Sequence, residues 1–170
     1  MKNNIDAHEN ILALIGNTPL IKLNKSVSDY KGKFFAKYEA NNPGHSNKDR
    51  IALHIVETAE KEGLINENTT IIETSSGNTG FSLSMVAMVK GYKCIVAVSN
   101  KSSKDKSDML KSMGAKVYVC PANVTADDKR SYYQVAKTLN SEIQDSIYIN
   151  QYFNELNIQA HYLTTGKEIW

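Results

Sequence analysis

The chain has 170 residues, of which 41% are hydrophobic and 22% are charged, and its formal net charge is +2. This composition is typical of a globular protein with a sizeable core, and the small net charge gives no reason to expect nucleic acid or a membrane as a partner. The first residues lack the apolar core of a signal peptide, and no stretch approaches the roughly 20 apolar residues of a membrane span. We therefore expect a cytoplasmic protein.

The first segments with a regular pattern are residues 21–23 and 34–38. They alternate apolar with polar residues or contain aromatic ones, which predicts two strands joined by a polar connection.

A turn at Asn42-Pro43-Gly44 precedes the next predicted element, a helix that begins at Lys48. Ser46 is a suitable N-cap, and Asp49 three residues later completes a capping box. The positive end of a helix dipole disfavours a second positive charge, which suits a lysine that acts as a nucleophile or base. Position alone leaves open the alternative of a lysine that is merely solvated.

A short buried strand within residues 67–73 is predicted from its β-branched run, and a loop of small residues leads from it to a helix starting near residue 81. Backbone N–H groups and the hydroxyls of Ser75, Ser76 and Thr79 suit a carboxylate or phosphate. The alternative is that glycine and serine are there only for the geometry of a tight turn.

Helix and strand patterns then alternate. We expect helices at residues 81–90 and 103–113, closed by Gly91 and Gly114, and a further helix between 127 and 139. Strands are expected near residues 94–98, 117–120 and 147–149. Repeated β-α-β units predict an α/β fold, a three-layer parallel sheet with helices on both faces, which binds ligands at the carboxyl ends of its strands. Ser75 to Thr79 and Gln151 lie at such ends.

Three further residues are predicted to be buried. Tyr133 has helical spacing with Ala136 and Leu139, which favours a place in the core. Cys94 and Cys120 lie in apolar strand-like runs, where free buried thiols are expected rather than a disulfide. The four histidines are scattered, and we expect no metal site.

Taken together, the ordered motifs resemble the cysteine synthase and cystathionine β-synthase family, which are pyridoxal phosphate enzymes of fold type II. The motifs that carry the resemblance occupy residues 15–20, 37–39, 42–50, 76–80, 151–152 and 161–166. The resemblance implies pyridoxal 5'-phosphate as cofactor, with Lys48 attached to it covalently and Asn78 beside its ring hydroxyl. It also implies that the substrate α-carboxylate is bound by Ser75, Ser76, Gly77, Asn78, Thr79 and Gln151. The family usually has threonine where Ser75 stands, a change that keeps the hydroxyl.

The activity that the resemblance implies is β-replacement: O-acetylserine or serine loses its β-substituent, and a sulfur nucleophile takes its place, as in cysteine biosynthesis. The alternatives are cystathionine β-synthase activity on serine and homocysteine, a dehydratase or deaminase, and a catalytically inert folding unit. The expected partners are an amino-acid substrate and a sulfur nucleophile, and family members are usually homodimers.

The resemblance also implies that the fold is incomplete at the C-terminus, because family members continue into a glycine-rich loop for the cofactor phosphate. We expect residues 1–45 to provide strands of a larger domain, 46–160 a smaller β/α domain with Lys48 and the substrate loop, and 161–170 the return to the larger domain. A capping box from Thr165 to Glu168 predicts one more helix. Strands without their partners would leave an exposed edge and apolar face.

Overall fold

The computed structural model describes residues 7–75 and 77–170, and within them a four-stranded parallel sheet is the central element. Its strand order is β5-β4-β3-β6, with β3 (Thr70–Thr74) and β4 (Lys93–Ser99) in the middle. The edges are β5 (Lys116–Cys120) and β6 (Ser146–Tyr148). The parallel sheet predicted from the repeated β-α-β pattern is confirmed.

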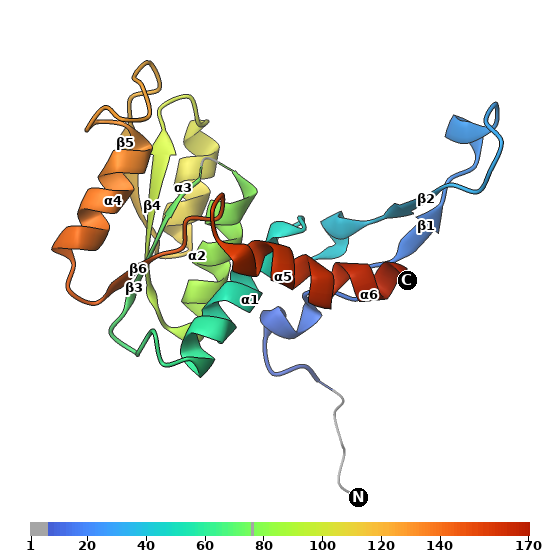
Figure 1. Cartoon of the computed structure of the whole chain (residues 1–170), viewed down its shortest axis with the longest axis horizontal. Helices are drawn as coiled ribbons and strands as arrows, with labels where there is room; N and C mark the ends of the chain where they lie inside the picture. Colours follow the sequence, from blue (N-terminus) through green and yellow to red (C-terminus); the bar gives the residue numbers. More distant parts are fainter. Residues whose placement is uncertain (1–6, 76) are drawn as a thin grey trace, which may run out of the picture.

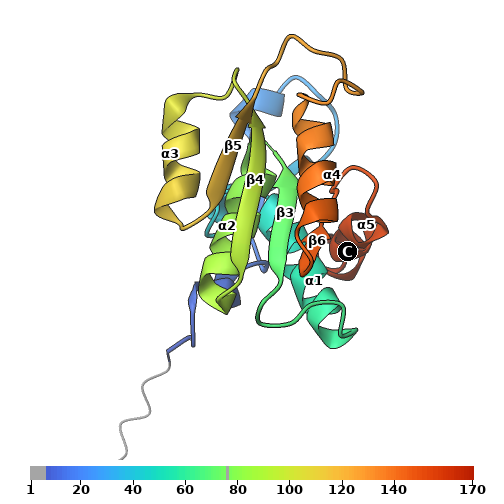
Figure 2. The ribbon, with the colours of Figure 1, turned by 90° about the vertical axis from the view of Figure 1, so that its left-hand side faces the viewer.

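Two buried apolar clusters, one on each face of the sheet, make the fold three-layered. Residues that alternate along the central strands separate cleanly: Ile71 and Val96 belong to the cluster with α1 (Lys48–Lys61) and α2 (Asn78–Lys90). Ile72 and Ile95 belong to the cluster with α4 (Tyr132–Glu142). Side chains alternate between the faces of a strand, so each central strand supplies both layers. In Figures 1 and 2, α4 lies on one side of the sheet and α2 with α1 on the other.

Helices α1 and α2 run side by side in the same direction. Near their first turns the hydroxyl of Ser82 on α2 donates to the carboxylate of Asp49 on α1. Near their last turns Lys90 on α2 forms an ion pair with Glu60 on α1 at 2.8 Å. Contacts at both ends fix the register of the two helices, and this brings their N-termini to the same edge of the sheet.

The C-terminal ends of the helices were predicted from the sequence more accurately than the N-terminal ends. Gly91 and Gly114 have positive φ angles of 81° and 84°, a conformation that favours glycine, and they follow α2 and α3 (Lys104–Ser112) as predicted. Helix α1 begins at Lys48 with Asn47 at the N-cap position; Ser46 Oγ accepts from the backbone N–H of Lys48 at 3.2 Å, as expected of a capping hydroxyl, but Asp49 makes no bond back to Ser46, so the capping box is wrong. The Asp49 carboxylate instead accepts from Ser82 and from the backbone N–H of Gly44, because these donors lie within its reach once α2 packs on α1.

The predicted start of α2 near residue 81 is also wrong by one turn, because α2 begins at Asn78. The first turn of α2 contains the polar residues Asn78 and Thr79. The prediction relied on the spacing of apolar residues, which cannot detect a polar first turn.

At the C-terminus, two helices follow the sheet, α5 (Glu155–Leu163) and α6 (Thr165–Ile169). Helix α5 packs on α1 and was not predicted. The capping box of Thr165 and Glu168 is wrong: α6 has no side-chain cap, and the Glu168 carboxylate forms ion pairs of 2.6 Å with both Arg50 and Lys37. The proposed boundary after residue 160 falls inside α5, and the division into domains stays a prediction.

The predicted N-terminal strands form an antiparallel hairpin of β1 (Leu20–Lys22) and β2 (Phe35–Lys37). Short 3₁₀ turns precede, join and follow them at Ile11–Leu14, Lys25–Val27 and Glu39–Asn41. Figure 1 shows the hairpin projecting away from the parallel sheet, beside α6. Ile21 is 44% exposed and Phe35 is 52% exposed, and the register places them on opposite faces of the hairpin, so apolar side chains are exposed on both faces and not on the single face expected.

Both cysteines lie in the described part of the chain and are buried free thiols, as expected. Tyr133 is only half-buried, and its neighbour Tyr132 packs against the core instead, so the placement of Tyr133 in the core is wrong. None of the helices in the described residues has the length and apolar character that a bilayer crossing requires.

Candidate active site

A cavity of about 370 Å³ opens where the N-termini of α1 and α2 meet the carboxyl ends of β3 and β6. It is lined by Lys48, Thr74, Ser75, Gly77, Asn78, Thr79, Tyr132, Gln151 and Tyr152. The structure therefore brings together six of the seven residues that the sequence proposed for cofactor or substrate. The seventh, Ser76, lies outside the described residues.

Lys48 is held at the cavity by the turn before α1 and by its neighbour in the helix. Its Nζ donates to Oδ1 of Asn47 at 3.1 Å. Asp49 next to it is fully buried and accepts from Ser82 and Gly44, and an added Cβ at Gly44 would collide with the Asp49 carboxylate. Burial raises the pKa of Asp49. The turn therefore needs glycine at residue 44, and it fixes the direction in which Lys48 leaves the helix.

The glycine loop is fixed against the sheet at its base. The backbone N–H of Ser75 donates to the carbonyl of Ala97 on β4 at 3.1 Å, and Ser75 Oγ accepts from the N–H of Gly77 at 3.2 Å. An added Cβ at Gly80 would lie 3.1 Å from the carbonyl oxygen of Ser75 and 3.1 Å from Val96. The absence of a side chain at Gly80 therefore lets α2 pack closely against Ser75 and Val96. The N-terminus of α2 lines the cavity, and the positive end of a helix dipole stabilises an anion.

Gln151 reaches the cavity from the end of β6, the strand beside β3. Its side chain is 8% exposed, and the Thr79 hydroxyl donates to its Oε1. With the oxygen end of the amide occupied, the NH₂ end is the one that can donate to a bound carboxylate.

A buried carboxylate, Glu73, lies directly behind Gln151, and the sequence analysis missed it. Glu73 is fully buried, accepts from the backbone N–H of Thr74 at 2.6 Å and from that of Gln151 at 3.1 Å, and also accepts from the Thr74 hydroxyl. Burial raises its pKa to about 7. A signal was present, because an acidic residue in an otherwise β-branched buried strand is rarely placed there without a partner.

Aromatic residues form the remaining wall of the cavity and were not proposed as site residues. Tyr132 and Tyr152 line it, and Tyr133 lies between them: the Tyr132 and Tyr133 rings stack at 4.2 Å, and the Tyr133 and Tyr152 rings meet edge to face at 6.3 Å. They come from the start of α4 and from the segment after β6, two regions that meet only in the folded chain.

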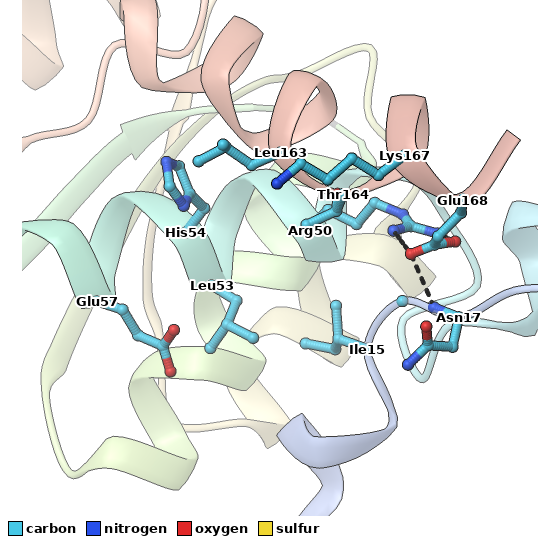
Figure 3. A pocket seen from close by; sticks show the side chains of 11 residues that line it. Ile15, Asn17, Arg50, Leu53, His54, Glu57, Leu163, Thr164, Lys167 and Glu168 are labelled. Carbon is cyan, nitrogen blue, oxygen red and sulfur yellow. Dashed lines mark hydrogen bonds and ion pairs between the residues drawn. The ribbon is translucent and has the colours of Figure 1, made fainter. Parts of the chain in front are cut away.

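A second cavity, of about 410 Å³, lies between α1, α6 and residues 15–17 (Figure 3). None of the proposed site residues lines it. At one end of it the Arg50 guanidinium and the Glu168 carboxylate form an ion pair at 2.6 Å, and Glu168 also accepts from the backbone N–H of Asn17. These groups satisfy one another, and the cavity is a junction between chain segments.

The residues around the first cavity fit pyridoxal phosphate. Its volume falls within the range of about 300–1,000 Å³ that is usual for small-molecule sites. Lys48 offers a primary amine for covalent attachment, Asn78 offers an amide for the ring hydroxyl, and the start of α2 offers donors for an anion. In the described residues, no group of three or more His, Cys, Asp or Glu side chains is arranged to hold a metal ion.

The parallel sheet, the lysine at a helix start and the glycine loop at the end of a central strand agree with a pyridoxal phosphate enzyme of fold type II. Residues 11–170 match the family described as "Pyridoxal-phosphate dependent enzyme", and the chain belongs to this family. The chain is 45% identical to cystathionine beta-synthase of Apis mellifera over 94% of its own length and 32% of that protein. It is 41% identical to cysteine synthase 1 of Emericella nidulans, over 92% of its own length and 42% of that protein.

The solved structures agree with this membership. A hydrogen sulfide-producing enzyme from Fusobacterium nucleatum is 36% identical, has a TM-score of 0.87 and matches 98% of this chain and 53% of its own. An O-ureido-L-serine synthase has the same TM-score of 0.87 at 31% identity. This chain spans 32% and 42% of the lengths of the two curated relatives named above.

Proposed function

We propose that this chain forms the lysine-bearing part of an enzyme that replaces the β-substituent of serine or O-acetylserine with a sulfur nucleophile. The observation that carries the proposal is that one cavity gathers Lys48, the glycine loop and Gln151, three segments far apart in the sequence. The relatives named cysteine synthase and cystathionine beta-synthase support this chemistry.

In this proposal Lys48 and Asn78 hold the cofactor. Bound pyridoxal phosphate supplies an electron sink for a carbanion at the substrate α-carbon. The Lys48 amine would be placed to take the proton from that α-carbon, because Lys48 starts a rigid helix and stands beside the substrate loop. The Asn78 amide would hold the cofactor by a hydrogen bond to the ring hydroxyl.

The substrate carboxylate is bound by the loop and by Gln151. Ser75, Gly77 and Thr79 line the same cavity as Gln151. The Thr79 hydroxyl donates to Gln151 and the Gly77 N–H donates to Ser75, so the Ser75 hydroxyl and the Gln151 NH₂ group remain as donors for a carboxylate. The α2 dipole favours negative charge at the cavity. Binding the carboxylate at this end fixes the α-carbon relative to Lys48, and orientation of this kind supplies a large share of the rate enhancement in enzymes.

A second candidate within the same chemistry is cystathionine formation from serine and homocysteine. It is favoured by the 45% identity to cystathionine beta-synthase, against 41% for cysteine synthase 1. Product analysis with serine and either sulfide or homocysteine as the nucleophile distinguishes the two, because only homocysteine yields cystathionine.

We infer further that the enzyme works in the cytoplasm on small molecules and, in its assembled form, as a homodimer. We also propose that residues 46–160 act as the smaller domain, with residues 1–45 and 161–170 belonging to a larger one. The hairpin that projects from the sheet supports this division, since its apolar residues have little contact with the sheet layers.

The test is to add pyridoxal phosphate to the 170-residue chain, reduce the mixture with borohydride, and map the labelled peptide. We expect the label on Lys48 and no label at that position in Lys48→Ala. Lys104 offers a matched control, because it also begins a helix but is exposed. Lys104→Ala should label at Lys48 like the parent chain. Equal labelling of Lys48 and Lys104, or label only at surface lysines, would refute the assignment and favour an inert folding unit.

A further inference from the structure

The wall behind the candidate carboxylate site contains a polar chain that the proposed mechanism does not use. It runs from Tyr148 through Thr74 to Glu73: the Tyr148 and Thr74 hydroxyl oxygens lie 3.1 Å apart, and the Thr74 hydroxyl donates to Glu73 Oε1 at 3.1 Å. Since the Thr74 proton points to Glu73, the Tyr148 hydroxyl must donate to Thr74. The other oxygen of the carboxylate, Oε2, accepts from the backbone N–H of Gln151 at 3.1 Å.

These hydrogen bonds join β3 and β6 near the carboxyl ends of the two strands, where each strand leads into residues that line the cavity. Thr74 and Glu73 end β3, directly before the glycine loop, and Tyr148 and Gln151 belong to β6 and the segment after it. Glu73 is fully buried, so its hydrogen bonds are not exchanged with water, and an ionised acceptor makes them about twice as strong as neutral ones. A buried carboxylate needs such partners to remain in the fold.

We propose that Glu73 is a positioning residue for the candidate carboxylate site: it fixes the backbone of Gln151 and, through Thr74, the base of the glycine loop. The proposal rests on the proposed function for the role of Gln151 itself. Glu73 lines no part of the cavity and acts on a bound substrate only through Gln151 and Thr74.

Protonation of Glu73 would change both contacts. The Gln151 N–H would lose its charged acceptor. A proton on Oε1 would have to be donated to the Thr74 hydroxyl, and that hydroxyl would then donate to Tyr148. The two hydrogen bonds would thus exchange donor and acceptor. The titratable side chains whose pKa the charge of Glu73 raises are Cys94 on β4 and Tyr148 and Tyr152 from β6 and its following segment. Because burial raises its pKa to about 7, Glu73 changes its charge near neutral pH.

The test follows the backbone amide signal of Gln151 by NMR while the pH of the 170-residue chain is raised from about 5 to about 8.5, a range that brackets the raised pKa of Glu73. We expect the signal to titrate with a midpoint near 7. In Glu73→Gln this titration should be lost. Glu67→Gln is the matched control, because it removes the same charge from an exposed position just before β3 and should keep the titration.

Thr74→Val is a second variant that tests the same contact if Glu73→Gln does not fold. The variant removes one donor to the ionised carboxylate, so the midpoint should rise by about one pH unit. A Gln151 amide that does not titrate in the parent chain, or one whose midpoint is the same in Thr74→Val, would overturn the proposal. In the active enzyme, Glu73→Gln should raise KM for the amino-acid substrate roughly tenfold with a smaller effect on kcat, since it loosens carboxylate binding.

These measurements separate the inference from the proposed function, because the NMR titration involves no cofactor. Failure of Lys48 to be labelled together with an intact titration would refute the proposed function alone. Labelling at Lys48 with a silent Gln151 amide would refute the role of Glu73 alone.

Discussion

The carboxylate of Asp49 joins three segments around the candidate active site. It belongs to α1, directly after Lys48, and it accepts from Gly44 in the preceding turn and from Ser82 on α2. Asp49 and Ser82 are fully buried and Gly44 is half-buried, and a buried donor without an acceptor costs about 1–3 kcal/mol. One side chain thus couples the position of Lys48 to the helix that carries Asn78.

We expect Asp49→Ala to lower the free energy of unfolding by about 2–5 kcal/mol, because it leaves the Ser82 hydroxyl and the Gly44 N–H without their acceptor. Urea-induced unfolding at pH 7 measures this change. Asp105→Ala is the matched control: Asp105 is also the second residue of a helix, but it is exposed. Its loss should cost about 0.3–1 kcal/mol through the helix dipole. Equal losses in the two variants would contradict the coupling.

Single site residues could be predicted from the sequence where they belong to a short local motif. Lys48, Asn78 and Thr79 stand in short ordered motifs, and the structure places them around one cavity. Glu73 could not be assigned a role, because its partner Gln151 is 78 residues further along the chain and meets it only through the pairing of β3 with β6.

Among the elements, α6 is a single short helix whose place depends on one side chain. Glu168 pairs with Arg50 and Lys37, and it accepts from the backbone of Asn17. A five-residue helix is not stable by itself in water, so these contacts hold it. Hydrogen bonds from Arg50 and Lys37 lower the pKa of Glu168 to about 2.

Glu168→Gln should therefore lower the free energy of unfolding by about 1–3 kcal/mol at pH 7, the usual value for hydrogen bonds to a charged group. The pKa of Glu168 is lower in the folded chain than in the unfolded one, so its contribution is present above about pH 4.5 and is lost as the pH falls toward 2. Urea titrations at several pH values should show the difference between parent and variant shrinking across that range.

Glu142→Gln, at the exposed end of α4, serves as the control and should follow the parent chain at each pH within about 0.5 kcal/mol. A constant difference between parent and Glu168→Gln from pH 7 to pH 2 would show that the ion pairs do not hold α6.

The strands were easier to predict from the sequence than the last helices. The runs around Ile71, Cys94 and Val117 are short, apolar and bounded by turn residues, and each proved to be a strand of the parallel sheet. Helix α5 was missed because four of its nine residues are polar and no glycine separates it from α6. The cap predicted at Thr165 failed because Glu168 is drawn to Arg50, 118 residues earlier.

In the whole molecule, helices cover the parallel sheet but not the two-stranded hairpin, and this difference bears on how the chain associates. The parallel sheet has helices on both faces, whereas the hairpin has its own two strands and little else. Ile21, Phe35 and Tyr38 are between 44% and 52% exposed, and Trp170 at the end of α6 is fully exposed. The strand register places Ile21 and Phe35 on opposite faces of the hairpin, so apolar side chains are exposed on both faces, which marks the hairpin as a segment that associates with another surface.

We expect the chain to self-associate through the hairpin, and the double variant Ile21→Lys, Phe35→Lys to weaken this association at least about tenfold, which corresponds to about 1.4 kcal/mol. Sedimentation at a series of concentrations should then show the average mass falling toward the 18.9 kDa of the single chain. Leu64→Lys changes an apolar residue that is 64% exposed next to α1, and it should associate like the parent. The same mass in all three proteins would contradict a role for the hairpin.

The arrangement in three layers could be predicted from alternating helices and strands, because a parallel sheet must be covered on both faces. The strand order β5-β4-β3-β6 could not, since nothing local in residues 146–148 specifies pairing with β3 rather than with β5.

One arrangement of the core makes the folding of each layer measurable without added labels. Cys94 belongs to the cluster under α1 and α2, and Cys120 belongs to the one under α4. Both thiols are less than 7% exposed, and burial raises the pKa of Cys94 to about 11, so neither reacts until its layer opens. The rates at which the two cysteines are alkylated under native conditions would therefore report separately how often each face of the sheet is uncovered.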